Sequence, residues 1–254
     1  MPTRRPQRIE YPDSGGPPVG ESEAHGRAFF DTAWCLGMRF AEDPEVYVWG
    51  NLLLYYEEGN PDARVCPDLF LVSGVPKNPP RRSYKLWEEK KAPLLVIEFT
   101  SERTREEDLG LKKDLYERLG VKEYFLFDPL GEHLEPRLQG YKRVKGRFKS
   151  LAPDADGSLK SRITGLILQA DGEGLRLRDG ESGDPLLWPR EVLEVAKMTL
   201  DGLEDLQEKS HAALATLDDL EQRAKDVEVR AKAAEERLLA LDQELATLRK
   251  EPVN

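Results

Sequence analysis

Apolar residues recur with two different periods along the chain, and each change of period marks an expected structural element. Between residues 21 and 40 they recur at helical spacing, which predicts a helix packed against a sheet. In residues 46–59, VYVWGNLLLYYEEG, two short apolar runs flank Gly50-Asn51, a pattern typical of two short strands.

The next part of the chain predicts two strands, a helix and a third strand. VCPDLFLV (65–72) and LLVIEFTS (94–101) are short apolar runs, and the second is apolar enough to be buried on both faces. Residues 104–119 carry leucines at four-residue spacing before Gly120, as a helix would. The segment VKEYFLFDP (121–129) has the composition of a strand. The leucines of the expected helix stripe are Leu111, Leu115 and Leu119.

The pattern changes after Pro129. Short apolar segments bounded by Gly or Asp predict antiparallel strands in a β-rich extension. These segments are GYKRVKGRFKSL (140–151), ITGLILQAD (163–171) and GLRLRD (174–179).

From Ala196 onward, apolar residues occupy the a and d positions of more than seven heptads, where only Thr199 and Ser210 are polar. No glycine or proline occurs between Leu203 and Glu251. The sequence therefore predicts a coiled coil, and a homodimer is its simplest form. A single helix folded back on the body is the alternative.

These patterns together predict an α/β protein with a mixed sheet flanked by helices, a β-rich extension and a long C-terminal coiled-coil helix. The expected domains are a flexible N-terminus at residues 1–20, the sheet domain with its extension at 21–190, and the coiled coil at 191–254.

The net charge of −10 argues against a protein that binds nucleic acid over its whole surface, because phosphate contacts come from lysine and arginine. Two cysteines and no long apolar run predict a cytoplasmic protein without disulfides or a membrane span. Two basic clusters are candidates for local phosphate contact, although a solvated loop and a solvated hairpin explain them as well. The first, expected near the acidic strands, is Lys77, Arg81, Arg82, Lys85, Lys90 and Lys91. The second is Lys142, Arg143, Lys145, Arg147 and Lys149.

Glu98 stands in the middle of a strand that is expected to be buried. Because a buried carboxylate is costly, such a residue usually binds a metal, pairs with a cation or transfers protons. Asp68 begins a second apolar run, and Asp108 and Lys112 share a helix face. A simple ion pair between Glu98 and Lys112, and a surface pair between Asp108 and Lys112, are the structural alternatives.

The sequence motifs of this region resemble those of one protein family. PDLFLV, IEFTS followed by TREED, the K-x-x-x-Y of Lys112 to Tyr116, and GVKEYFLFDP are similar to the Uma-two family of the PD-(D/E)XK nuclease superfamily. The resemblance implies a restriction-endonuclease-like fold in which Asp68 and Glu98 bind metal. The superfamily lysine usually lies two residues after the strand acid, where this chain has Thr100, so the resemblance implies that Lys112 replaces it.

Phosphodiester hydrolysis needs an activated water and stabilisation of added negative charge. Mg²⁺ or Mn²⁺ held by Asp68 and Glu98 would supply both, and Lys112 would assist the attacking water. Weaker candidates are Asp108, Thr100 and Glu23, and we interpret Tyr116 as a packing residue.

The expected function is therefore a metal-dependent endonuclease that hydrolyses DNA. The alternative is a catalytically silent nuclease-fold scaffold that acts in oligomerisation or partner binding through its coiled coil.

Overall fold

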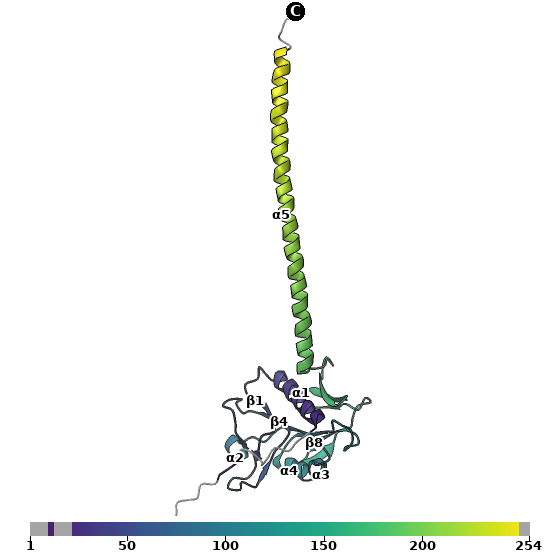
Figure 1. Ribbon diagram of the computed structural model, residues 1–254. Coiled ribbons are helices and arrows are strands. Elements are labelled where there is room, and N and C mark those ends of the chain that lie inside the picture. The colour runs from purple at the N-terminus through teal and green to yellow at the C-terminus, as the bar shows by residue number, and fades with distance from the viewer. Residues whose placement is uncertain (1–9, 13–21, 249–254) are drawn as a thin grey trace, which may run out of the picture. The chain divides into compact units, whose positions relative to one another are not determined.

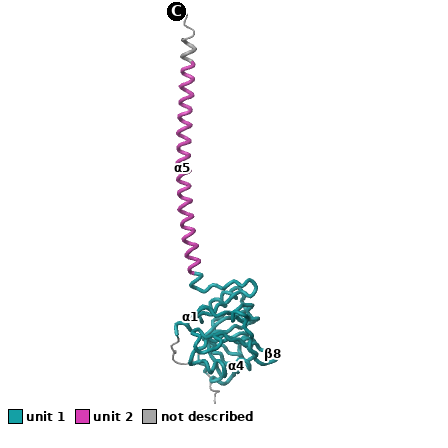
Figure 2. Tube along the Cα trace, turned by 90° about the vertical axis from the view of Figure 1, so that its right-hand side faces the viewer, with its two compact units in different colours: residues 1–192 teal, residues 193–254 magenta. Residues whose placement is uncertain are grey.

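The computed structural model describes residues 10–12 and 22–248, with side chains described as far as residue 242. Two compact units comprise residues 1–192 and 193–254, which Figure 2 colours separately. The first unit contains mixed sheets with their helices, and the second consists mainly of one long helix. The predicted α/β fold with a β-rich extension and a long C-terminal helix is confirmed.

A six-stranded sheet forms the centre of the first unit, with strand order β1-β4-β6-β7-β8-β9. The neighbours β6 and β7 are parallel, and the other neighbouring pairs of this sheet are antiparallel. The strands are β1 (Val46–Trp49), β4 (Leu69–Ser73), β6 (Leu95–Phe99), β7 (Glu123–Phe127), β8 (Leu138–Val144) and β9 (Arg147–Ser150).

Two small sheets accompany the main one, with strand orders β10-β11-β12 and β3-β2-β5. The first of them contains two of the three expected segments of the β-rich extension, whereas the segment 140–151 forms most of β8 and all of β9 in the main sheet. Their strands are β2 (Leu54–Tyr55), β3 (Arg64–Val65), β5 (Tyr84–Lys85), β10 (Leu159–Lys160), β11 (Leu166–Asp171) and β12 (Gly174–Asp179).

Helix α1 (Glu23–Arg39) lies against one face of the main sheet (Figure 1). Ser22 caps it, because the Ser22 hydroxyl accepts a hydrogen bond from the His25 amide at 3.2 Å. Helices α3 (Arg105–Leu109) and α4 (Leu111–Leu119) join β6 to β7, since two parallel strands require a crossover connection. The remaining helices are α2 (Leu86–Glu89) and α5 (Pro189–Leu248).

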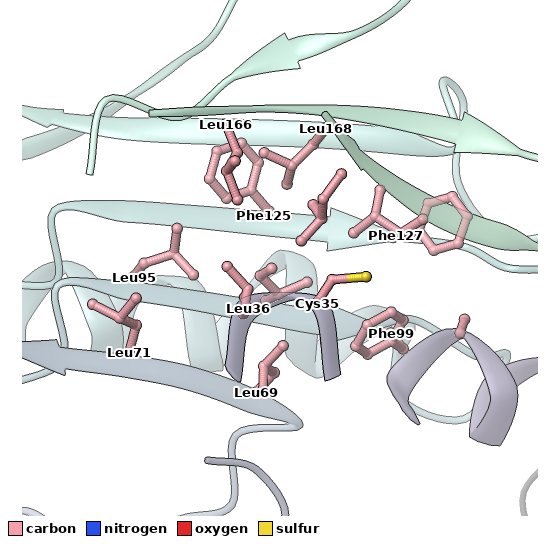
Figure 3. Packing of buried hydrophobic residues seen from close by; sticks show 14 of the residues in the cluster. Cys35, Leu36, Leu69, Leu71, Leu95, Phe99, Phe125, Phe127, Leu166 and Leu168 are labelled. Atoms are coloured by element: carbon pink, nitrogen blue, oxygen red, sulfur yellow. The ribbon is translucent and has the colours of Figure 1, made fainter. Parts of the chain in front are cut away.

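Side chains alternate across the main sheet and supply two apolar cores. The first core lies under α1 and the β10–β12 sheet, and it includes Leu36, Phe125 and Leu168 (Figure 3). The second core contains Val96 of β6, Tyr116 of α4 and Leu54 of β2. Both faces of β6 are therefore buried, as the apolar run predicts.

The segment 104–119 is not the single helix that the sequence predicts. It breaks at Gly110, whose φ of −117° and ψ of −94° are not helical. The expected leucine stripe is also wrong in part, because the Leu111 side chain is 77% exposed. A different stripe, formed by Asp108, Lys112 and Tyr116, faces the sheet.

The terminal segments are described in part. Of the segment expected to be flexible, residues 10–12 are described, and the Tyr11 ring packs edge-on to Tyr55; its other residues lie outside the described ones. Helix α5 runs continuously through the predicted heptads with leucines such as Leu217 and Leu238 exposed. Within the described residues, we find no helix with the length and apolar character that a membrane crossing needs. The expected domain boundaries and coiled-coil pairing remain predictions.

Candidate functional site

Asp68 and Glu98 are brought together by the antiparallel pairing of β4 with β6. Leu69 lies opposite Ile97, so the residue before β4 meets the end of β6. The Asp68 amide donates to Glu98 Oε2 at 3.2 Å, and the Phe99 amide donates to Asp68 Oδ2 at 2.8 Å. Main-chain amides thus hydrogen-bond to both carboxylates. Strand pairing brings the two acids close together although they lie far apart in the sequence.

Glu98 lies on the face of β6 that also carries Val96, because strand residues two apart share a face. This is the face of the second core, over which α4 packs. Glu98 is completely buried, whereas Asp68 is partly exposed. The pair therefore reaches from the protein interior toward the surface.

Helices α3 and α4 contribute three polar side chains spaced four residues apart. Lys112 Nζ lies 3.0 Å from Glu98 Oε2 and 2.9 Å from Asp108 Oδ1. The Tyr116 hydroxyl donates to Glu98 Oε1 at 2.6 Å. Asp108 is completely buried and its main-chain carbonyl accepts a hydrogen bond from the Tyr124 hydroxyl at 2.9 Å. Both oxygens of Glu98 are thus oriented by the helix pair.

The electrostatics of the cluster are dominated by burial. Burial raises the pKa of Glu98 to about 8 and the pKa of Asp68 to about 6, although the ammonium of Lys112 opposes both shifts. For Lys112, burial disfavours the charged form, but Glu98, Asp108 and Asp68 outweigh it and raise its pKa. Burial also raises the pKa of Tyr116, which keeps its phenol protonated as a donor. The cluster therefore holds a permanent cation among acids that are costly to ionise.

The Lys112 ammonium pairs with the carboxyl groups of Glu98 and Asp108, and some buried oxygens of the cluster lack a hydrogen-bond donor. The carboxylate oxygens of Asp108 and the hydroxyl of Thr100 are buried without a hydrogen bond; the 2.9 Å approach of Lys112 to Asp108 is an ion pair without hydrogen-bond geometry. Buried carboxyl groups that are costly to ionise, together with oxygens that lack donors, suit a hard divalent cation, which would stabilise the ionised form. Within residues 10–12 and 22–248, however, no three His, Cys, Asp or Glu side chains form a metal-binding group. A site with two carboxylates and water ligands is what these residues fit.

The remaining candidates separate in space. Thr100 follows β6 and is buried, on the same side as Glu98 by strand alternation. Glu23 is exposed at the start of α1 and pairs with Arg27. Asp108, which could be a surface residue by its sequence context, is instead buried, so the surface-pair interpretation is wrong.

The first basic cluster does not sit where the sequence suggests. Its segment leaves β4 at Ser73 and enters β6 at Leu95. These are the strand ends that lie farther from Asp68 and Glu98. Several of its cations have structural partners: Arg81 pairs with Glu89, and Lys77 donates to main-chain carbonyls near the end of α1. The cluster lies between the two acidic strands in the sequence but not near the acids in space. Because β4 and β6 are antiparallel, the segment between them joins the ends away from Asp68 and Glu98.

Tyr116 is the residue whose role the sequence analysis underestimates. Its hydroxyl binds the buried carboxylate of Glu98, which simple packing does not explain. The signal was present in the four-residue spacing from Lys112, since that spacing places both side chains on one helix face.

Comparisons with known proteins agree with the resemblance. A family model described as "Putative restriction endonuclease", named Uma2, matches residues 1–161. No curated protein matches the chain. Among solved structures, the crystal structure of "a putative nuclease belonging to DUF820" from Anabaena variabilis ATCC 29413 aligns with a TM-score of 0.43 and 12% identity, over 58% of this chain and 76% of that one. Because this family model matches more than half of the chain, the chain belongs to the Uma2 family of restriction-endonuclease-like proteins.

Proposed function

We propose that the chain is a divalent-metal-dependent nuclease that hydrolyses phosphodiester bonds in DNA. The observation that carries the proposal is the pairing of the Lys112 ammonium with both Glu98 and Asp108, while the Asp68 amide donates to the same Glu98 carboxylate. Such an excess of acids in a buried cluster is expensive unless a cation or protons balance it. Family membership supports nuclease chemistry at this cluster.

In this proposal Asp68 and Glu98 hold Mg²⁺ or Mn²⁺. The ion supplies Lewis acidity toward a phosphoryl oxygen and lowers the pKa of water. The protein's own residues position the two carboxylates. Asp68 is held by the Phe99 amide, and Glu98 by the Tyr116 hydroxyl, so both carboxylates are preorganised.

Lys112 is the only cation among these side chains, and its raised pKa keeps it charged. A fixed ammonium beside the reacting phosphate would orient the attacking water and stabilise the added negative charge. Asp108 and Tyr116 act as positioning residues, because Asp108 orients Lys112 and Tyr116 orients Glu98. This assignment gives Lys112 the role that the superfamily pattern places two residues beyond Glu98.

We also propose that α5 pairs with α5 of a second copy. The unpaired helix exposes a stripe of large apolar side chains, and coiled-coil pairing would remove that stripe from water. A dimer would bring two nuclease sites to the two strands of a duplex. The exposed stripe equally favours the second candidate function, a scaffold without catalytic activity, so the two candidates differ in chemistry and not in assembly.

The deciding experiment is calorimetric titration of Mn²⁺ into the full chain and into its Asp68→Ala/Glu98→Ala variant, with a DNA-cleavage assay on the same samples. We expect saturable binding and cleavage by the wild type and the loss of both in the variant. Asp114→Ala, an exposed acid on α4, is the matched control for removing negative charge. Glu23→Ala tests the weaker candidate and is expected to keep both activities.

Mn²⁺ binding that survives the double substitution would remove these acids from the metal site. Metal binding without cleavage of single-stranded or duplex DNA would favour the scaffold.

A further inference from the structure

A cavity of about 470 Å³ opens in the β-rich part of the first unit. Small-molecule sites typically enclose about 300–1,000 Å³. Its lining residues are Lys142, Leu151, Ala152, Asp154, Lys160 and Arg162. This composition joins three cations with two apolar side chains and one acid.

The cavity is separate from the acidic cluster. Lys142 of β8 lies opposite Glu123, the first residue of β7. Glu98 lies opposite Leu126, near the other end of β7. A ligand in the cavity therefore occupies the opposite end of this strand from the proposed metal site.

Two walls of the cavity are anchored to the protein interior. Leu151 packs against the first core. The Arg162 amide donates to the carboxylate of buried Glu123 at 2.8 Å, and the neighbouring Ser161 hydroxyl donates to the same carboxylate at 2.6 Å. Glu123 is thus turned toward the 161–163 main chain, and it fixes the backbone from which Arg162 extends.

The lining carries three positive charges, from Lys142, Lys160 and Arg162, and one negative charge, from Asp154. In the described part of the chain, none of Lys142, Lys160 and Arg162 has a carboxylate within ion-pair distance, and Lys160 donates only to the Gly180 carbonyl at 3.3 Å. Lys142 also lies directly opposite Lys149 on β9. Like charges that face each other across strands destabilise a sheet. In a chain whose net charge is −10, this local excess of cations is best explained by an anionic ligand.

We propose that this cavity binds a small phosphorylated molecule of mononucleotide size. The guanidinium of Arg162 can form paired hydrogen bonds with a phosphate, and Lys142 and Lys160 add point charges. Leu151 and Ala152 provide an apolar surface for the body of the ligand. The limited volume favours a monomer over a nucleic acid strand.

The test is calorimetric titration of the full chain with adenosine monophosphate and, separately, with inorganic phosphate. We expect saturable binding of the nucleotide and weaker binding of phosphate, which lacks an apolar body. Arg162→Ala and Lys142→Ala should each weaken nucleotide binding about tenfold or more, since each removes one charge from the phosphate. Lys232→Ala on α5 removes the same charge far along the sequence from the cavity and should leave binding unchanged.

Circular dichroism and thermal melting of each variant would establish that it is folded. Absence of saturable binding of either probe at millimolar concentration would overturn the proposal, as would unchanged nucleotide binding by the Lys142→Ala/Arg162→Ala double variant. Binding of an oligonucleotide through these residues, without binding of the mononucleotide, would replace the small ligand by a nucleic acid strand. Asp68→Ala should still bind the nucleotide, so failure of the nuclease proposal would be distinguishable.

Discussion

Lys112 contacts Glu98 and Asp108 at once, because Asp108 in α3 and Lys112 in α4 lie on either side of the break at Gly110 while strand β6 presents Glu98 to the same side. Its side chain is only 14% exposed, so its charge is screened little by water. The geometry of the site thus depends on the contacts of a few side chains, and single substitutions can test the role of each one.

We predict that Lys112→Ala lowers DNA cleavage more than tenfold while metal binding is retained. The substitution removes a fixed charge beside the reacting phosphate without removing a proposed metal ligand. Cleavage rates and Mn²⁺ calorimetry on the same variant separate these effects. Lys113→Ala is the control, because Lys113 lies over the Tyr141 ring and carries the same charge. Cleavage at the wild-type rate by Lys112→Ala would exclude Lys112 from the mechanism.

A second prediction concerns Glu98 and pH. In the metal-free folded protein burial raises its pKa from 4.5 to about 8, so folding favours the protonated form. Its stabilising contribution is complete below about pH 4.5 and is lost as the pH rises through about 8. We therefore expect the free energy of unfolding to fall between about pH 4.5 and 8, by on the order of 1 kcal/mol or more.

Urea denaturation at a series of pH values, in the presence of a chelator, measures this effect. Glu98→Gln, which cannot titrate, should flatten the pH dependence over that range. An equally steep dependence in Glu98→Gln would show that another group is responsible.

Among the structural elements, the end of β1 has a direct effect on the site. A Cβ atom at Gly50 would lie 1.9 Å from the Asp68 carbonyl oxygen and 2.6 Å from Phe29 Cε2. Only glycine lets the chain approach Asp68 this closely. The turn after β1 therefore helps to place the first acid of the site.

We predict that Gly50→Ala destabilises the fold by about 1–3 kcal/mol and weakens Mn²⁺ binding, because the main chain at Asp68 must shift. Gly37→Ala is the matched control: no atom lies within 4 Å of its added Cβ, and alanine in a helix should stabilise by about 0.5–1 kcal/mol. Thermal melting and calorimetry report both properties. Normal stability and metal affinity in Gly50→Ala would contradict the role assigned to this turn.

For the whole molecule, the open question is assembly. Leucines of α5 from Leu203 to Leu241 are exposed in the single chain, and association is the usual way to bury such a stripe.

We predict that the full chain is at least a dimer at micromolar concentration and that deletion from Ala196 onward leaves a folded, mostly monomeric domain. Light scattering and circular dichroism on both proteins measure these properties. A monomeric full-length chain would rule out self-pairing of α5. A truncated domain that stays dimeric would place the interface in the first unit.

The sequence by itself determined the order of the main elements, and its resemblance to the Uma-two family implied that Asp68, Glu98 and Lys112 form one site. The order of the elements follows from local properties of the sequence: the strand and helix periods, the proline before Asp68 and the four-residue spacing from Asp108 to Lys112. Only the tertiary structure decided which helix face is buried: Asp108, Lys112 and Tyr116 face the sheet, whereas Leu111 is exposed. It also decided that the cluster 77–91 joins the far ends of β4 and β6, and that Lys142 and Arg162 line one cavity. Burial and proximity of this kind depend on strand pairing between distant segments, which no local pattern records.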